Sequence, residues 1–186
     1  MYIITDLETT GLPIQGAPPE QQPGITQLGW MIIDEDFLPI EEGLFWVDPE
    51  KEIEEAASKI TGITRELLKE KGAKPLYVHL PELATLYRRH HTWVGFNNKF
   101  DRTVLWYQIA RYDWGWKFPW PTNDIDVMSV GKDICNIPGK QGIKPPKLIE
   151  LHKFLFGEEF ESAHDALVDV RATQRCLAEI KKRELI

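Results

Sequence analysis

The chain has 186 residues, of which 42% are apolar and 27% charged, so it is long enough to form one domain with a sizeable core. No apolar run reaches the roughly 20 residues of a membrane-spanning helix, and no secretory signal is visible at the N-terminus. The two cysteines, Cys135 and Cys176, form no C-x-x-C pattern. A disulfide framework or a thiolate metal site is therefore not expected, and the cytoplasm is the expected compartment.

The charge of the chain is unevenly distributed. A net charge of −7 argues, taken alone, against a nucleic-acid-binding protein. Residues 34–70 hold twelve acidic and four basic residues, a balance of −8, whereas residues 132–153 hold five lysines and two acidic residues, a balance of +3. Either segment can be ordinary solvated surface, and residues 140–153 of the basic one could also follow a phosphate backbone.

The first quarter of the chain predicts three β-strands. Their connections are short, apart from one loop with four prolines and two glycines, and this suggests an antiparallel start to the sheet. The predicted strands cover residues 2–5, 25–34 and 44–47, and the loop covers residues 13–24.

From about residue 56 onward the pattern alternates between helices and strands. Helical signals cover 56–70 with a break at 61–62, then 81–90, 100–111, a segment ending at 131, 147–156 and 162–182, and strands are expected at 91–96 and near 125. We therefore predict a single α/β domain over residues 1–186, with a mixed central β-sheet whose first three strands are antiparallel and whose two faces are covered by helices.

Two carboxylates follow the first predicted strand, in the stretch D-L-E-T-T-G. Asp6 and Glu8 are two residues apart, and in an extended strand such residues point to the same face. Two neighbouring negative charges raise each other's pKa unless a cation lies between them, and hard cations such as Mg²⁺ and Mn²⁺ prefer carboxylate oxygens. On its own, the pair is more often an ordinary polar strand end than a metal site.

Two further segments place polar residues at the ends of apolar patterns. G-F-N-N-K-F-D ends in Asp101, and S-A-H-D-A-L-V-D holds His164, Asp165 and Asp169 at the predicted start of the last helix. Each has a simple structural explanation, because Asn98 or Asp101 could cap a helix and acids are favourable near a helix N-terminus.

Taken together and in this order, D-x-E-T-T-G, N-x-x-F-D and H-x-x-x-x-D resemble the DnaQ-like 3′–5′ exonucleases of the DEDDh type, which have the ribonuclease H-like fold. The resemblance covers nearly the whole chain and includes I-T-G-I-T at 60–64 and Asp126 in D-I-D-V-M-S-V. Proofreading members commonly have Glu where this chain has Gln27 and His where it has Phe96, and neither position supplies a metal ligand in the family.

The resemblance implies roles for individual residues. Asp6, Glu8 and Asp169 would hold one Mg²⁺ or Mn²⁺, Asp6 would bridge to a second, and Asp101 would act partly through water. His164 would be the general base that takes a proton from the attacking water. The residues expected on the substrate side are Thr9, Thr10, Gly11, Leu12, Asn97 and Phe100.

The implied function is hydrolysis of the 3′-terminal phosphodiester of a single-stranded nucleic acid, with DNA favoured and nucleoside 5′-monophosphates as products. A proofreading or repair role would bring in a DNA polymerase as a partner, and no membrane is expected. The alternatives are an enzyme that trims RNA 3′ ends or degrades oligoribonucleotides, a non-catalytic nucleic-acid-binding or polymerase-associated module, and a ribonuclease H-type endonuclease. DNA and RNA differ at the 2′-hydroxyl, and contacts to that group cannot be read from this sequence.

Overall fold

The computed structural model describes residues 1–115 and 117–185, and its first three strands form an antiparallel meander. These strands are β1 (Tyr2–Thr9), β2 (Ile25–Ile33) and β3 (Pro39–Asp48). The turn between β2 and β3 is tied by the Asp34 carboxylate, which accepts hydrogen bonds from the backbone N–H groups of Asp36 and Leu38 at 2.9 and 2.8 Å. The antiparallel start predicted from the sequence is confirmed.

The other strands of the main sheet lie parallel to their neighbours. β5 (Thr92–Gly95) pairs with β1, β6 (Asn123–Asp126) pairs with β5, and the two-residue β4 (Lys74–Pro75) pairs with β3. The order across the sheet is β4-β3-β2-β1-β5-β6. The parallel strands β1, β5 and β6 therefore end at the same edge of the sheet, where ligands of open α/β sheets commonly bind.

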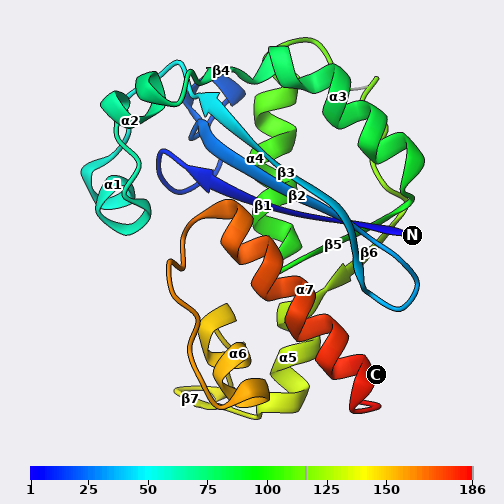
Figure 1. Cartoon of the computed structure of the whole chain (residues 1–186). Helices are drawn as coiled ribbons and strands as arrows, with labels where there is room; N and C mark the ends of the chain where they lie inside the picture. Colours follow the sequence, from blue (N-terminus) through cyan, green and yellow to red (C-terminus); the bar gives the residue numbers. More distant parts are fainter. Residues whose placement is uncertain (116, 186) are drawn as a thin grey trace.

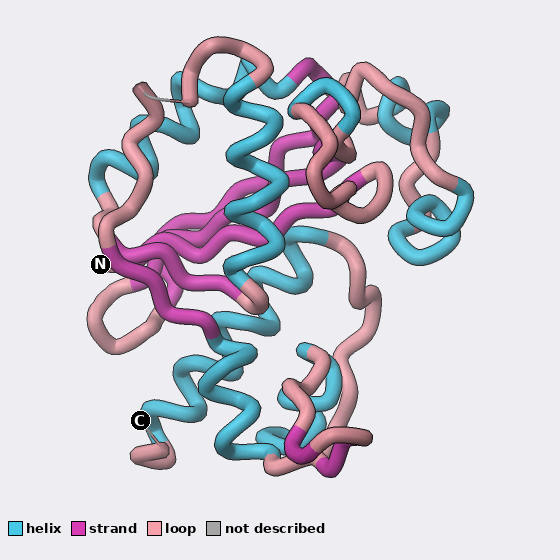
Figure 2. The backbone as a smooth tube through the Cα atoms, turned by 180° about the vertical axis from the view of Figure 1, so that it is seen from behind, coloured by secondary structure: helices cyan, strands magenta, loops and turns pink. Residues whose placement is uncertain are grey.

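Helices cover both faces of the sheet, because β1 sends alternate side chains to opposite sides. Ile3 and Leu7 pack with the residues of α3 and α4, whereas Ile4 packs with those of α5, α6 and α7. Figure 1 shows α5, α6 and α7 together on one face, and Figure 2 shows α4 crossing the opposite face. The helices are α1 (Glu55–Thr61), α2 (Arg65–Glu70), α3 (Leu76–Arg89), α4 (Asn98–Ala110), α5 (Val127–Cys135), α6 (Leu148–Phe156) and α7 (Ala166–Lys182), with a 3₁₀ turn at Pro19–Gln21.

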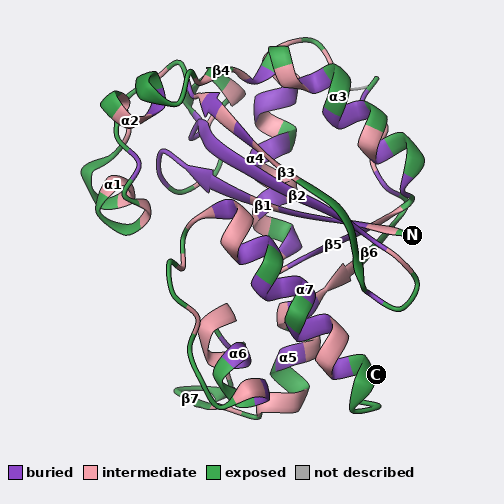
Figure 3. Cartoon of the chain, viewed as in Figure 1, coloured by how far each residue is buried: buried purple, intermediate pink, exposed green. Residues whose placement is uncertain are grey.

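Burial follows this layering. Every residue of β2 is buried, whereas α1 contains no buried residue and the first half of β3 is exposed (Figure 3). Within the part of the chain that the structure describes, no helix has the length and apolar character needed to cross a bilayer.

Several boundaries differ from those predicted: β3 begins at Pro39 and not at residue 44, α3 begins at Leu76 and not at residue 81, and α5 ends at Cys135 and not at residue 131. β1 continues to Thr9, because its pairing with β2 extends that far, so Asp6 and Glu8 lie inside the strand and not beyond its end. α7 begins at Ala166 and not near Ser162, because Asp165 caps it and Ser162 and His164 have left-handed backbones with φ of 61° and 72°. A small hairpin, β7 (Pro138–Gly139) and β8 (Gly142–Ile143), lies in the predicted loop before α6.

Candidate active site

A cleft of about 650 Å³ lies where β1 ends, bordered by the first residues of α4 and α6, by α1, and by the segment around the start of α7. Of the eleven residues predicted for the site, ten line it: Asp6, Glu8, Thr9, Gly11, Leu12, Asn97, Phe100, Asp101, His164 and Asp169. Thr10 does not. Its buried hydroxyl accepts a hydrogen bond from the Gly24 backbone N–H at 2.9 Å, so it ties the loop after β1 to the start of β2.

Asp6 and Glu8 project from the same face of β1 into the cleft. Burial, reinforced by the negative charges of Asp101, Asp169 and Glu8, raises the pKa of Asp6 well above its usual 3.8. Burial also raises the pKa of Glu8, from its usual 4.5 to about 8, with Asp169 and Asp165 adding to the effect. Both carboxylates are therefore poorly accommodated as anions without a cation.

Asp101 approaches the pair from the first turn of α4. It is buried, and this burial raises its pKa well above 3.8, although hydrogen bonds from the Leu7 backbone N–H and from its own backbone N–H act in the opposite direction. α4 packs on the face of the sheet opposite α7, and its Asp101 lies near the backbone of Leu7 in β1. Asp101 thus borders the cleft on the side opposite α7.

The other two predicted catalytic residues, His164 and Asp169, enter from the start of α7. Glu8, His164 and Asp169 each offer one ligand atom, and these atoms all lie within 4.8 Å of one another. The backbone N–H of His164 donates to Asp169 Oδ2 at 3.1 Å, and the His164 side chain is exposed at the cleft. Burial raises the pKa of Asp169 to about 6, even though the His164 N–H bond favours its charged form.

The arrangement fits a divalent cation. The buried Oδ1 atom of Asp169 has no hydrogen-bond partner among the described residues, and none of the lysines and arginines in residues 1–115 and 117–185 forms an ion pair with Asp6, Glu8, Asp101 or Asp169. Four carboxylates without a positive partner are unfavourable, and oxygen-rich sites of this kind suit Mg²⁺ and Mn²⁺.

Asn97 is held at the cleft by Asp126. Its backbone is left-handed, with φ of 70°, and its N–H donates to Asp126 Oδ1 at 2.9 Å. The same Oδ1 atom accepts a hydrogen bond from the Met128 backbone N–H at 3.1 Å and so caps α5. Asp126, recognised in the sequence by its match to the family pattern, therefore orients a residue of the cleft and does not line the cleft itself.

Two charged residues of the cleft were not predicted from the sequence. Glu54 forms a backbone hydrogen bond with Thr10, and its carboxylate covers Gly11, where an added Cβ would lie only 2.2 Å from Glu54 Oε1. Lys147 lies just before α6 and borders the cleft on another side. Glu54 belongs to the acidic segment, whose charges have an ordinary surface interpretation, and Lys147 belongs to the basic segment that could follow a phosphate backbone, but the sequence singles out neither residue.

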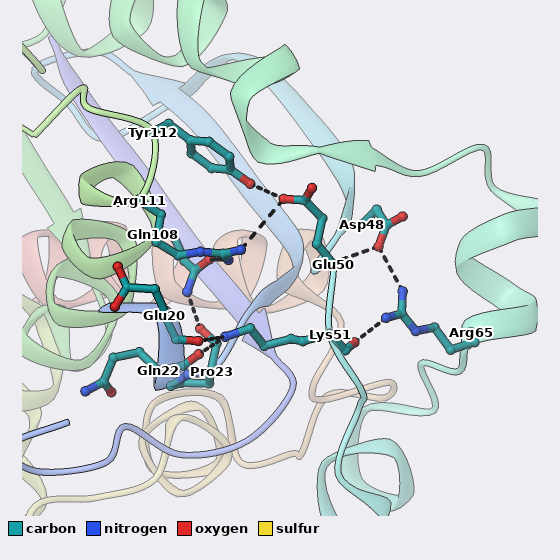
Figure 4. Close-up of polar contacts among 10 residues, drawn as sticks. All are labelled: Glu20, Gln22, Pro23, Asp48, Glu50, Lys51, Arg65, Gln108, Arg111 and Tyr112. Carbon is teal, nitrogen blue, oxygen red and sulfur yellow. Dashed lines mark hydrogen bonds and ion pairs between the residues drawn. The ribbon is translucent and has the colours of Figure 1, made fainter. Parts of the chain in front are cut away.

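The segment that leads to Glu54 is anchored by a polar network (Figure 4). The Lys51 ammonium donates to the backbone carbonyls of Gln22 and Glu20, and Arg65 donates to Lys51 O and, at 2.8 Å, to Asp48 Oδ1. The buried Gln108 of α4 donates to Pro23 O at 2.6 Å. This network joins the loops after β1 and β3 to α2 and α4. The segment that carries Glu54 into the cleft is therefore fixed by hydrogen bonds and an ion pair outside the cleft.

Comparisons with known proteins identify a family for this chain. The family model described as Exonuclease (RNase_T) matches residues 3–177. No curated protein matches the chain at a significant level.

Several solved structures are similar over nearly the whole chain. The zinc-bound form of Escherichia coli exonuclease I with single-stranded DNA is 25% identical, with a TM-score of 0.76, over 98% of this chain and 41% of that one. Exonuclease I from Methylocaldum szegediense is 22% identical, with a TM-score of 0.75, over 98% of this chain and 40% of its own. Exonuclease X in complex with 5′ overhanging duplex DNA is 22% identical, with a TM-score of 0.66, over 98% of this chain and 92% of its own.

This chain thus spans about two fifths of the exonuclease I chains and most of exonuclease X. The six-stranded mixed sheet and its similarity to these structures confirm the predicted ribonuclease H-like fold. Since the family model covers most of the sequence, the resemblance inferred from the three motifs is also confirmed. The chain belongs to the RNase_T family of DnaQ-like exonucleases.

Proposed function

We propose that residues 1–186 form one exonuclease domain that hydrolyses the 3′-terminal phosphodiester of a single-stranded nucleic acid and releases nucleoside 5′-monophosphates. The observation that carries the proposal is the convergence of Asp6, Glu8, Asp101 and Asp169 with His164 in one cleft. DNA is the favoured substrate, because the similar exonuclease I and exonuclease X structures contain DNA.

The four carboxylates would hold two divalent cations, Mg²⁺ or Mn²⁺, with Asp6, Glu8 and Asp169 at one and Asp6 and Asp101 at the other. When bound, such ions neutralise the clustered charge and stabilise the attacking and leaving oxygens of an in-line displacement. The four carboxylates would supply the oxygen ligands of these ions.

His164 is suited to be the general base. Its side chain is exposed at the cleft while its backbone is fixed by the hydrogen bond to Asp169, and one imidazole nitrogen lies within 4.8 Å of a carboxylate oxygen of Glu8 and of Asp169, where an attacking water would bind. Imidazole accepts protons effectively near neutral pH. His164 would remove the proton from the attacking water and later release it to solvent.

The terminal nucleotide would lie against the apolar wall of the cleft. Leu12 is 75% exposed, and Phe100 also lines the cleft, so both offer surface to a sugar or a base. Thr9 and Gly11 form a turn in which the Thr9 hydroxyl donates to Gly11 O at 2.8 Å, and Asn97 adds a polar group on the α4 side.

A single assay tests the proposal and its alternatives. Purified protein is incubated with internally labelled single-stranded DNA or RNA, either linear, circular or 3′-blocked, in the presence of Mg²⁺, Mn²⁺ or EDTA. We expect stepwise shortening from the 3′ end and mononucleotide products with either metal, and no reaction in EDTA. Faster turnover of RNA than of DNA would indicate an RNA-trimming enzyme. Cleavage of a circular or 3′-blocked strand would indicate an endonuclease. The absence of products from both DNA and RNA would indicate a non-catalytic module.

A further inference from the structure

Gln27 is a buried polar side chain directly beside the acidic pair. It lies on β2 opposite Glu8 of β1 in the antiparallel ladder, so the two side chains share a face of the sheet. Its Oε1 atom accepts a hydrogen bond from the Ala166 backbone N–H at 3.1 Å, and its Nε2 atom faces Asp165 Oδ2 at 3.4 Å. The Gln27 amide therefore contacts both Asp165, which caps α7, and Ala166, the first residue of α7.

Asp165 completes this connection on the helix side. Its Oδ1 atom caps α7 by accepting hydrogen bonds from the backbone N–H groups of Leu167 and Val168 at 3.1 and 3.2 Å. His164 precedes this cap directly, and Asp169 lies one turn further along the helix. A shift of the cap relative to β2 would therefore move both of these residues relative to Glu8.

The approach of α7 to the sheet leaves little room for adjustment. An added Cβ at Gly29, two residues along β2 from Gln27, would lie 2.5 Å from the Ala166 carbonyl oxygen. The backbone at the start of α7 thus rests on β2 at the position opposite Asp6. Contact at Gly29 sets the distance between strand and helix, and the Gln27 amide sets the position along the strand.

The chemistry of the contact requires an amide at one of its two positions. The Ala166 N–H can only donate and an ionised Asp165 can only accept, so a side chain between them must carry both an acceptor and a donor. A carboxylate at position 27 could still accept from Ala166. It would also place a negative charge against Asp165, in a site that already contains Glu8 and Asp169.

We propose that Gln27 and Asp165 form an amide–carboxylate clamp that positions His164 and Asp169 against Glu8 for the exonuclease reaction. The part of this inference that concerns turnover rests on the proposed function. Gln27 is a positioning residue. Its amide contacts Ala166 and Asp165, and it affects the reaction only by holding the start of α7, and with it His164 and Asp169, in place.

The test exchanges the amide of residue 27 and the carboxylate of residue 165. Gln27→Glu should lower kcat about 10- to 100-fold, the usual effect of disturbing residues that orient metal ligands, with little change in KM. It should also weaken Mn²⁺ binding, measured by calorimetry without nucleic acid. The double variant Q27E/D165N should recover most of both losses, because an amide at position 165 can donate to a carboxylate at position 27 and still cap α7.

Gln174→Glu is the matched control. Gln174 is also a buried glutamine whose amide bridges elements, since its Nε2 atom donates to the Phe37 carbonyl at 2.6 Å, but it lies on α7 away from the cleft. The Gln174→Glu substitution should lower the unfolding temperature and leave kcat and Mn²⁺ affinity unchanged.

The two measurements, kcat and Mn²⁺ affinity, distinguish failure of the clamp from failure of the proposed function. If the unmodified protein releases no nucleotides, the exonuclease proposal fails, and Mn²⁺ affinity alone decides on the clamp. Unchanged kcat and Mn²⁺ affinity in Q27E would overturn the clamp. Absence of recovery in Q27E/D165N would overturn it too, as would equal losses in the Q174E control.

Discussion

Four carboxylates meet where β1 ends, and the backbone stabilises the charge of two of them. The nearby Leu7 backbone acts to lower the pKa of Asp101, and Asp169 accepts a hydrogen bond from the His164 backbone N–H, whereas burial and neighbouring negative charge dominate at Asp6 and Glu8. Backbone N–H groups thus stabilise part of the charge, and a cation is needed for the remainder. At this scale, four converging acidic residues without a positive partner indicate metal chemistry, and their burial indicates how strongly the metal is needed.

Replacement of His164 tests its role as the base. We expect His164→Asn to lower kcat about 10²- to 10⁴-fold, the usual contribution of general acid–base catalysis. Asn is preferred to Ala because the left-handed backbone at this position is tolerated by Asn. Steady-state kinetics should show the loss, while Mn²⁺ calorimetry and thermal unfolding stay close to those of the unmodified protein. Turnover close to that of the unmodified protein would exclude His164 as the base.

The raised pKa values predict how the stability of the metal-free protein depends on pH. In the unfolded chain, Glu8 returns to its ordinary pKa of 4.5, whereas in the folded metal-free protein its pKa is about 8. Asp169 changes in the same direction, from 3.8 to about 6. The folded state therefore binds more protons between these values, so its stability is highest below the unfolded pKa and decreases as the pH rises to about 8.

Thermal unfolding in EDTA between pH 5 and 8 would measure this decrease. One pKa unit corresponds to about 1.4 kcal/mol, and 1 kcal/mol shifts the midpoint by roughly 2–4 °C for a domain of this size. Added Mg²⁺ or Mn²⁺ should remove the decrease, because the ions bind the ionised folded form. The Glu8→Gln variant should show a smaller decrease in EDTA, and a pH-independent midpoint in the unmodified metal-free protein would contradict the prediction.

At the scale of elements, the contact between β2 and α7 connects the fold to the site. Gly29 lies opposite Asp6 and directly under the Ala166 carbonyl. We expect Gly29→Ala to lower the free energy of unfolding by about 1–3 kcal/mol, the usual cost of overpacking. The atoms that an added Cβ would meet belong to the backbone of Ala166 and Leu167, so they cannot rotate away. We also expect a loss of kcat, since α7 carries Asp169.

Chemical denaturation and kinetics on the same preparation would check both effects. Gly115→Ala is the matched control, because the nearest atom to an added Cβ there is 3.8 Å away, in ordinary contact. A stable and fully active Gly29→Ala variant would show that α7 can move away from β2 without consequence.

The elements also show where prediction from sequence succeeds. The apolar run of β2 and the three-to-four spacing in α7 predict these elements, because each buries a continuous face. The start of α7 was predicted too early, since Ser162 and Asp165 are both plausible caps and only the left-handed backbone at His164 decides between them. The hairpin at 138–143 was missed, because two-residue strands leave no periodic pattern.

At the scale of the whole molecule, the fold class follows from the order of elements, but the site does not. Asp6, Asp101 and Asp169 are far apart in sequence, and no spacing rule determines that the ends of β1 and the starts of α4 and α7 meet. The family resemblance supplied that information. Glu54, Lys147 and the Gln27–Asp165 clamp could not be recognised, because they depend on contacts between segments distant in sequence.

The distribution of charge over the molecule predicts how it grips a strand. Lys144 and Lys153 of the basic segment are paired with Glu150 and Glu159, and of the five lysines in residues 132–153 only Lys147 lines the cleft. With a net charge of −7, the protein should contact few phosphates beyond the terminal nucleotide.

Binding should therefore depend on the 3′ end and little on strand length. The logarithm of affinity for single-stranded DNA should fall with the logarithm of salt concentration with a slope no steeper than about −2, since each neutralised phosphate contributes about −0.7. Fluorescence anisotropy with the inactive His164→Asn variant would measure it, using a short and a long oligonucleotide with the same 3′ sequence. A clearly steeper slope for the long strand would mean that a basic surface outside the cleft holds the phosphate backbone, and Lys132→Glu and Lys140→Glu would then be expected to abolish the difference.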